Sequence, residues 1–333
     1  MDQKNTPLRR FTLRLQSIAF SALLMSIVSS ANAQELLWSD EFDSGDQPNP
    51  DNWSYDLGTG QNGWGNLELQ THTNQPSNAA VRDGNLVITA RQTMSGDEVV
   101  GFTSARIRTQ DKFMFKYGTI EARIKVPDLG RGLWPAFWTL GNNFPEVGWP
   151  AAGELDIMEM GSQAAILSGN VNRTVKSTAH YDDSGHKFYG LSLVANENLN
   201  DDFHLFRMEW TPNLVSTYLD DVKIWEIDIT APYLSTEFHN PHFVVLNLAV
   251  GGTFPNALSI GDVDAPFPAE LQVDYVRVYD NGFTEVSGTS LAAPDIGPAH
   301  SGSWYNSGQS GHGFSMEFAE LEGLGPIAAI YWY

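Results

Sequence analysis

The sequence predicts an all-β fold built as one large antiparallel β-sandwich, and three observations support this. Short runs rich in Val, Ile, Thr, Phe and Tyr recur from Leu36 to Tyr279, broken by Gly, Asn, Asp and Pro. Several runs alternate between apolar and polar residues, and no long stretch shows the 3.6-residue period of a helix. The chain contains no cysteine, so a large core rather than disulfides must hold the fold together.

The strand-like runs follow one another along this central region. Residues 85–90 (NLVITA) come directly after an Asp83-Gly84 turn. Residues 118–126, 215–220 and 272–279 alternate in the way that half-buried strands do. Their number and shortness favour two stacked antiparallel sheets over any helical architecture.

The two ends of the chain differ from this region. Residues 1–33 combine four basic residues, an apolar run too short to span a bilayer, and small residues before Gln34. This pattern is typical of a secretory signal peptide, so we expect a secreted protein, extracellular or periplasmic. We predict a main domain over 34–281, a linker rich in small residues over 282–299, and a partial C-terminal module of unknown role over 300–333.

The composition argues against several classes of partner and site. The chain carries 19 Lys and Arg against 40 Asp and Glu, a net charge of −21. Loss of the signal peptide removes four basic and one acidic residue, which changes −21 to −24. That charge argues against nucleic acid or a membrane as partner of the mature form, and mildly against a sulfated polysaccharide. The eight His residues show no zinc-binding spacing.

Three carboxylates stand within six residues of an otherwise apolar, strand-like run: Glu154, Asp156 and Glu159. Side chains two positions apart on a strand share a face, so Glu154 and Asp156 point the same way. In a regular strand Glu159 would point into the core. One β-bulge near Ile157-Met158 would turn it to the side of the other two acids.

An acid cluster of this kind has three interpretations. It could be a solvated or salt-bridged strand face, a cation site, or a pair of carboxylates that cleaves a glycosidic bond. The apolar and aromatic neighbours weaken the first interpretation. Three acids this close cannot all ionise cheaply, so their titration would be coupled and one Glu would stay protonated near neutral pH. The residues favour the glycosidase and leave the other two interpretations open.

The stretch around these acids resembles the active-site strand of glycoside hydrolase family 16, in its bulged Glu-x-Asp-x-x-Glu form. The resemblance covers roughly residues 36–280, and within the family it is nearest to the bacterial laminarinase-like endo-β-1,3-glucanases. Ala152 stands where those enzymes more often have Ser. Segments that resemble the family in the same order are 64–70, 103–109, 115–125, 132–138, 149–154, 241–252 and 273–279.

The resemblance implies a jelly-roll β-sandwich of two stacked antiparallel sheets with an open concave substrate cleft. It also implies hydrolysis with retention by a catalytic domain over 34–281. Glu154 would be the nucleophile, Glu159 the acid/base, and Asp156 the residue that orients and tunes Glu154. We expect no cofactor for catalysis, a neutral polysaccharide as substrate, and a monomer.

Sugars present apolar C–H faces, so sugar sites use aromatic platforms and a few polar side chains. Core packing competes with a substrate contact for Trp134, Trp138 and His180, and turn or surface roles compete for Asn66 and Arg106. Asn247 would face the cleft if its neighbours Leu246 and Leu248 face the core. The matched segments and residue types predict eight substrate contacts: Trp64, Asn66, Arg106, Trp134, Trp138, Trp149, His180 and Asn247.

The resemblance also implies a structural Ca²⁺ on the convex side of the domain, away from the cleft. The candidate ligands are Glu41, the backbone carbonyl of Gly84, and Asp274. Oxygen ligands suit this ion. A competing interpretation pairs Asp274 with a nearby base such as Arg277.

The sequence therefore predicts a secreted, endo-acting glycoside hydrolase that cleaves laminarin-like β-1,3-glucan with retention by double displacement. One alternative is the same mechanism on mixed-linkage β-1,3-1,4-glucan or on a galactan such as agar. The bulged form disfavours the dedicated mixed-linkage lichenases. An alternative of a different class is a non-catalytic carbohydrate-binding β-sandwich, against which the three intact acids argue.

Overall fold

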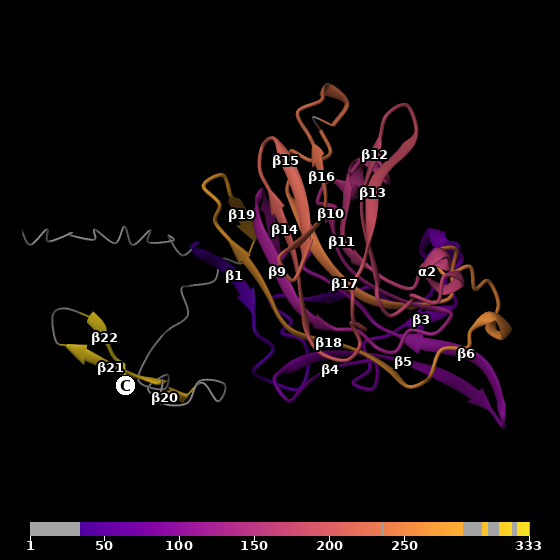
Figure 1. Cartoon of the computed structure of the whole chain (residues 1–333), viewed down its shortest axis with the longest axis horizontal. Helices are drawn as coiled ribbons and strands as arrows, with labels where there is room; N and C mark the ends of the chain where they lie inside the picture. Colours follow the sequence, from indigo (N-terminus) through magenta and orange to yellow (C-terminus); the bar gives the residue numbers. More distant parts are fainter. Residues whose placement is uncertain (1–33, 235, 289–301, 306–312, 322–324, 333) are drawn as a thin grey trace, which may run out of the picture. The chain divides into compact units, whose positions relative to one another are not determined.

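The computed structural model describes residues 34–234, 236–288, 302–305, 313–321 and 325–332. Within residues 34–288 nearly all regular structure is β-strand, arranged in two large sheets that Figure 1 shows as two layers. Their strands pair antiparallel, except that β3 runs parallel to β6. The predicted all-β sandwich of two stacked sheets is confirmed.

The first sheet has ten strands, and its main path runs β16-β15-β14-β9-β18-β5-β6-β3, with β1 beside β18 and β4 beside β5. Its strands are β1 (Leu36–Asp40), β3 (Gln70–His72), β4 (Ala79–Arg82), β5 (Asn85–Ser95), β6 (Glu98–Ser104), β9 (Gly118–Lys125), β14 (His204–Trp210), β15 (Leu214–Leu219), β16 (Val222–Asp228) and β18 (Ala269–Tyr279).

The second sheet has nine strands, in the order β13-β12-β11-β10-β17-β7-β2, with β8 beside β17 and β19 beside β8. Its strands are β2 (Ser54–Tyr55), β7 (Arg106–Arg108), β8 (Phe113–Lys116), β10 (Leu133–Gly141), β11 (Glu154–Glu159), β12 (Thr174–Asp182), β13 (His186–Val194), β17 (His242–Val250) and β19 (Glu285–Gly288). The short helical turns are η1 (Gly63–Leu67), α1 (Phe144–Val147), α2 (Gln163–Leu167), η2 (Pro232–Leu234) and η3 (Ile260–Asp262).

The hydrophobic core lies between the two sheets and follows from the alternation of the strands. Ile120 and Ile124 of β9 are fully buried and belong to the same cluster as Leu155, Leu246 and Leu248 of the nine-stranded sheet. Burying each such aliphatic side chain contributes about 1.5–3 kcal/mol relative to leaving it exposed. The alternate residues of the nine-stranded sheet are therefore turned away from this core, which is where the functional side chains lie.

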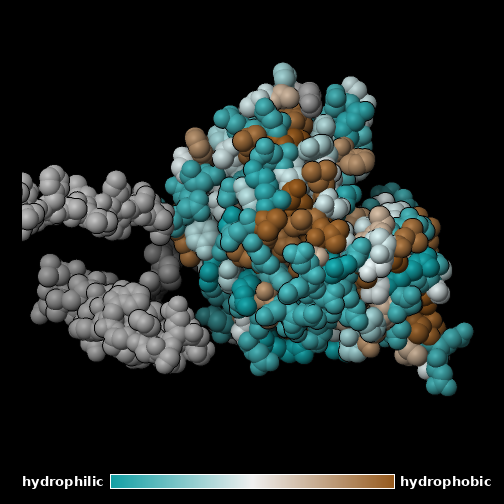
Figure 2. Space-filling view, in the orientation of Figure 1, coloured by the Kyte–Doolittle hydropathy of each residue, from teal (hydrophilic) through white to brown (hydrophobic). Residues whose placement is uncertain are grey.

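The edge strands of the two sheets, β13 and β16, are in contact with each other. Both expose large apolar side chains, among them Leu191 of β13 and Val222 of β16. Figure 2 shows hydrophobic residues grouped near the middle of the face that it presents. Between these two strands the rings of Tyr189 and Trp225 are in edge-to-face contact, with centres 5.8 Å apart.

The ends of the chain are described only in part. The predicted signal peptide, 1–33, lies outside the described residues, and among those described no helix is long and apolar enough to cross a membrane. The predicted linker needs a correction, because β19 (Glu285–Gly288) lies within 282–299 and pairs with β8. In the C-terminal segment, β20 (Gly302–Tyr305), β21 (Gly313–Leu321) and β22 (Gly325–Trp332) form a three-stranded antiparallel sheet.

Candidate active site

The acid strand β11 contains the bulge that the spacing of its acids requires. Against β12, Asp156 pairs with Thr178 and Glu159 with Lys176, so the register shifts by one residue between the two acids. The register against β10 shifts over the same stretch. Ile157 and Met158 are both buried in the core. The bulge predicted near these two residues is confirmed, and Glu159 is turned toward the side of the other acids.

Both ends of the acid strand are fixed by glycines that no other residue could replace without strain. Gly153, directly before Glu154, has φ +77°, and a Cβ there would lie 2.8 Å from the Cβ of Glu237. Gly161, after the strand, has φ +97°, and a Cβ would lie 2.0 Å from the carbonyl oxygen of Leu133. Because the neighbouring chain passes so close to each glycine, the position of the acid strand relative to its neighbours is fixed at both ends.

We use the name acid face for the side of β10, β11, β12 and β17 that is turned away from the core. Leu246 and Leu248 belong to the core between the sheets, so Asn247 lies on the acid face, as its alternation predicted. The acid face has a small apolar cluster of its own, which includes Trp138, Phe243 and Val245. Its members on β10 lie beside the acids, because Leu140 pairs with Glu154, Trp138 with Asp156 and Ala136 with Glu159.

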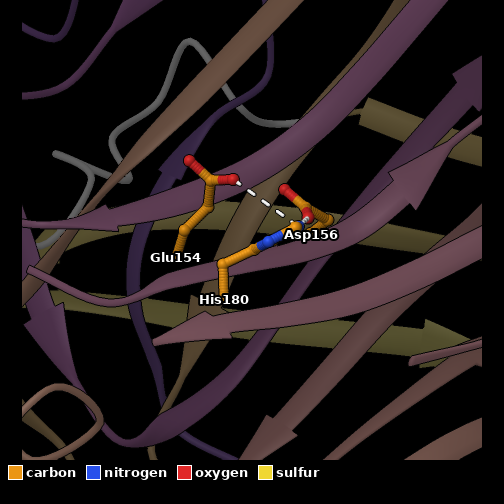
Figure 3. Close-up of side chains that lie close together, drawn as sticks. All are labelled: Glu154, Asp156 and His180. Atoms are coloured by element: carbon orange, nitrogen blue, oxygen red, sulfur yellow. Dashed lines mark ion pairs between the residues drawn. The ribbon is translucent and has the colours of Figure 1, made fainter. Parts of the chain in front are cut away.

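Each of the three acids has a defined neighbour on the acid face. Nε2 of His180 lies 3.2 Å from Oδ2 of Asp156 and 3.9 Å from Oε1 of Glu154. Figure 3 shows these three side chains converging. The indole N–H of Trp134 donates a 3.0 Å hydrogen bond to Oε1 of Glu159. Asp156 and Glu159 are buried, and the side chain of Glu154 is 17% exposed.

Burial and mutual repulsion make these carboxyls hard to ionise. Burial, followed by the neighbouring Asp156 carboxylate, raises the pKa of Glu154. Burial also raises the pKa of Asp156, against the opposing effect of Lys176. For Glu159, burial and then Asp156 raise the pKa to about 8. The arrangement therefore holds protons on part of the cluster at neutral pH, which is the condition for a general acid.

Trp138, a predicted substrate contact, lies on the acid face but its ring is largely covered by other side chains. Trp138 is only 9% exposed, and its indole N–H donates a 2.7 Å hydrogen bond to Oδ1 of Asn247. The guanidinium of Arg106 lies 4.7 Å from the centre of its ring. Trp138 therefore holds Arg106 through a cation–π contact and Asn247 through a hydrogen bond, and its contact with substrate stays a prediction.

Arg106 itself is held by both aromatic and ionic contacts. Its guanidinium also lies 4.9 Å from the ring of Trp64, so it sits between two indoles. Its Nε lies 2.9 Å from Oδ2 of Asp56, whose other oxygen is 3.1 Å from Arg108. A cation fixed in this way keeps its remaining N–H groups in one place, where they could donate to a sugar hydroxyl.

Asn66, in η1, belongs to a hydrogen-bond network with Glu68 and Gln70 that was not predicted from the sequence. Its amide donates to Oε1 of Glu68 at 3.3 Å, and Gln70 donates to Oε2 at 2.6 Å. Burial raises the pKa of Glu68. The signal was present in the sequence, because Glu68 and Gln70 are two apart in an extended run and share a face.

Trp149 is the most open of the predicted platforms, with 46% of its surface exposed. Its ring lies 4.4 Å from the ring of His186 and 6.0 Å from that of His180. His186 was not predicted as a site residue. It is the first residue of β13, where it pairs with Asp182 of β12.

A second group of unpredicted residues lies beside Glu159. Phe254 stacks on Trp134, with ring centres 4.8 Å apart and an angle of 18°. Nζ of Lys176 lies 5.6 Å from the ring of Phe254 and 5.8 Å from that of Phe188. The signal for Lys176 was its position four residues before His180 on the same strand, which places both on the acid face.

The candidate calcium ligands are engaged in ion pairs. Arg277 donates two hydrogen bonds to Glu41, at 2.9 and 2.7 Å, and Arg123 lies 2.8 Å from Asp274. The base beside Asp274 is therefore Arg123 and not Arg277. Oxygen donors of the right kind are present, but both carboxylates are neutralised by arginines, so an ion would have to displace them. The calcium site stays a prediction.

Other candidate sites are weaker than the acid cluster. Among the described residues, one group has possible metal-ligand atoms that all lie within 4.8 Å of one another: Glu154, Asp156 and His180. A cation there would neutralise carboxylates that a glycosidase needs free, and we assign no metal to it. A hollow of about 320 Å³ lined by Lys125, Asp128 and Glu270 lies by the ten-stranded sheet and contains none of the predicted site residues.

Comparison with known proteins identifies the family. The family model described as Glycosyl hydrolases family 16 matches residues 67–265. A beta-glucanase from Rhodothermus marinus is 38% identical over 256 residues, which is 74% of this chain and 85% of that protein. The clotting factor G alpha subunit of Tachypleus tridentatus is 36% identical over 264 residues, 77% of this chain but 36% of that protein, so the chain spans about a third of it.

A solved structure agrees with these relatives. The laminarinase catalytic domain from Thermotoga maritima superposes with a TM-score of 0.63 at 38% identity, covering 74% of this chain and 98% of that one. The fold, the acid strand and the sequence relatives all lead to one assignment. The chain belongs to glycosyl hydrolase family 16.

Proposed function

We propose that this protein is an endo-acting β-1,3-glucanase that hydrolyses laminarin-like glucan with retention, through Glu154, Asp156 and Glu159. One observation carries the proposal: the bulged strand β11 presents all three acids on one face of the sheet. The relatives named for beta-glucanase and laminarinase activity support the substrate class. Members of this family need no cofactor for catalysis.

The proposed reaction uses two carboxyl groups in two steps. Ionised Glu154 attacks the anomeric carbon, while protonated Glu159 gives its proton to the departing glycosidic oxygen, so the C–O bond breaks as the glycosyl–enzyme bond forms. In the second step Glu159 takes a proton from water, and the resulting hydroxide equivalent displaces Glu154. Two inversions at the same carbon give overall retention.

Asp156 and Trp134 have supporting roles in this mechanism. The negative charge of Asp156 raises the pKa of Glu159, which keeps the acid protonated until the leaving group needs its proton. The hydrogen bond from Trp134 fixes one oxygen of Glu159 and leaves the other free to reach the substrate. The exposed ring of Trp149 and the partly exposed ring of Trp134, with Asn66 and Arg106, are the proposed sugar contacts.

The decisive experiment compares Glu154→Ala and Glu159→Ala with Glu146→Ala, an exposed acid in α1 that serves as the matched control. We expect laminarin hydrolysis to fall by roughly 10³-fold or more in the first two and to be unchanged in the control. On an aryl β-glucoside oligomer with a good leaving group, Glu159→Ala should still form the glycosyl–enzyme, since that group departs without a proton. Near-normal laminarin turnover in either Glu variant contradicts the proposal.

Product analysis on laminarin, lichenan and agarose tests the substrate class separately. We expect the largest kcat/KM on laminarin, with internal cleavage giving short oligosaccharides. Dominant activity on lichenan would favour the mixed-linkage alternative, and activity on agarose would favour the galactan one. Binding of laminarin without cleavage would favour the non-catalytic alternative.

We further propose that the protein is secreted and acts as a monomer on a neutral polysaccharide. The signal-like segment 1–33 supports secretion, and the mature charge of −24 favours a neutral over an anionic polysaccharide. Secretion is tested by expressing the full chain with its own leader and locating the product. The N-terminal residue of the exported protein should be close to Gln34.

Calcium binding at Glu41, Gly84 and Asp274 is a separate proposal. If the ion binds, a chelator should lower the melting temperature by a few degrees, because a ligand that binds only the folded state stabilises it. A Glu41→Gln variant should then lose its response to the chelator. A melting temperature that the chelator leaves unchanged means that the arginine pairs alone occupy these carboxylates.

A further inference from the structure

Two histidines connect the acid cluster to the surface of the β12–β13 hairpin. Nδ1 of His180 lies 2.8 Å from Nε2 of His186, and the two rings are nearly parallel, with centres 5.1 Å apart and an angle of 20°. The other nitrogen of His180, Nε2, points at Asp156 and Glu154 (Figure 3). The order of contacts is therefore His186, His180, Asp156.

The partners of His180 determine where its proton lies. Its Nε2 is 3.2 Å from an oxygen of Asp156, and an ionised carboxylate can only accept, so Nε2 carries a hydrogen whenever Asp156 is ionised. A neutral imidazole then has no hydrogen on Nδ1, which needs a donor. The Nε2–H of His186 is placed to supply it at 2.8 Å.

We propose that His186 is a positioning residue of the active site: its Nε2–H holds His180 as the Nε2–H tautomer, so that His180 donates toward Asp156 and Glu154 when these acids are ionised. This inference rests on the catalytic roles proposed above for those two acids. Without the donor, His180 is free to move its hydrogen to Nδ1. A lone pair would then face two carboxylates, and their ionised forms would be disfavoured.

The packing around His186 suits a fixed donor. His186 is exposed, and the rings beside it are Trp149, 4.4 Å away between ring centres, and Phe188, 5.9 Å away, which restrict its rotation. Burial and the neighbouring His180 lower the pKa of His186, which favours its neutral form. The titratable groups that face the pair are Glu154 and Asp156 of β11, with Lys176 further along β12 and Asp182 opposite His186 in the hairpin.

The test compares two substitutions with matched shape. His186→Phe keeps an aromatic ring between Trp149 and His180 but cannot donate, whereas His186→Gln places an amide N–H near the position of Nε2. The expected result for His186→Phe is a shift of the acidic limb of kcat/KM to higher pH, because the acid that must be ionised then holds its proton longer. At a pH on that limb the loss should be about fivefold, the equivalent of one net hydrogen bond. His186→Gln should restore most of it.

An NMR measurement tests the tautomer without reference to activity. Imidazole ¹⁵N shifts of wild type should show His180 with hydrogen on Nε2 alone, and His186→Phe should show a mixture of tautomers. Hydrogen on Nδ1 of wild-type His180 overturns the proposal, as does a His186→Phe pH profile equal to that of wild type. His186→Gln behaving like His186→Phe overturns it too. If Glu154→Ala stays fully active, the catalytic roles fail instead, so the two failures are distinguishable.

Discussion

The three acids illustrate how a side chain acquires its chemistry from neighbours rather than from its own structure. An isolated Glu ionises near pH 4.3. On the acid face, burial and Asp156 raise the pKa of Glu159 to about 8. The same Asp156 raises the pKa of Glu154. Burial and, after it, one neighbouring carboxylate thus raise the pKa values of both Glu residues.

Replacing Asp156 by Asn should shift the pH dependence in a defined direction. The charge that raises the pKa of Glu159 is lost, so that pKa falls and Glu159 loses its proton at lower pH. Because the reaction needs Glu159 protonated, the alkaline limb of kcat should move down by roughly one pH unit. Initial rates on laminarin between pH 4 and 10 measure this.

The matched control for this prediction is Asp182→Asn in the neighbouring hairpin. Asp182 accepts a hydrogen bond from the backbone N–H of Gly185, and it is not among the groups that shift the pKa values of the three acids. Its variant should keep the wild-type alkaline limb. An Asp156→Asn limb at or above the wild-type position would show that Asp156 does not raise the pKa of Glu159.

At this scale the sequence predicts some residues well and others poorly. The acids are predictable, because two-residue periodicity and one bulge decide their direction. Trp138 is not, because periodicity gives its face but not the Arg106 side chain that covers it. Asp274 shows the same limit. One interpretation of the sequence paired it with a base such as Arg277, and in the structure the base beside it is Arg123 of the neighbouring strand.

At the scale of elements, the acid strand is held by what lies at its ends. The carbonyl oxygen of Leu133 on β10 passes so close to Gly161 that no side chain fits between them. Gly161 follows Glu159 by two residues, so a displacement there would reach the acid directly. The contact between Gly161 and Leu133 therefore helps to fix the position of Glu159, the proposed acid/base.

Substituting Gly161 by Ala should therefore destabilise the fold by roughly 3 kcal/mol or more, from a positive φ together with a 2.0 Å overlap. Gly169→Ala is the control, because Gly169 also has a positive φ, +69°, but open space around its Cα. That change should cost about 1 kcal/mol. Urea unfolding of both variants measures the difference, and equal losses would show that the contact with Leu133 is not limiting.

The strands themselves were largely predictable, and their ends were not. Runs such as 118–126 and 272–279 alternate clearly, and they correspond to β9 and β18. The strand β19, of four residues with the sequence EVSG, was missed. Such a segment has no alternation of its own, and its strand conformation comes from pairing with β8, which is over 160 residues away in sequence.

For the whole molecule, this missed strand places the C-terminal limit of the sandwich beyond the predicted one. Glu285 pairs with Lys116 through an ion pair of 2.7 Å, and Gly288 pairs with Phe113. The paired part of the chain thus extends seven residues past the predicted domain end at 281. Any shortened form of the protein needs these residues.

Two truncations test this boundary. A chain that ends after Gly288 should keep the melting temperature and laminarin activity of the full chain. One that ends after Thr284 loses β19 and with it an edge ladder worth roughly 2 kcal/mol, which lowers the melting temperature by about 4–8 °C. Scanning calorimetry measures both, and equal melting temperatures would mean that β19 adds nothing to the fold.

The architecture as a whole was predictable from the alternation and the absence of cysteine, since few folds bury so many short two-faced strands. The concave shape of the substrate cleft came only from the resemblance. Sheet curvature depends on twist and bulges summed over many strands, which no local pattern contains.

The bulge in β11 has a consequence for how such a site could be altered. In the bulged strand Glu154 and Glu159 are five positions apart and lie on the same face. In a regular strand without the extra residue they would be four positions apart and would also share a face. Deleting Met158 would place Glu159 four positions after Glu154, an even number, so both acids would stay on the acid face. The spacing of the acids can therefore change by one residue without loss of their common direction, whereas a second insertion would send Glu159 into the core.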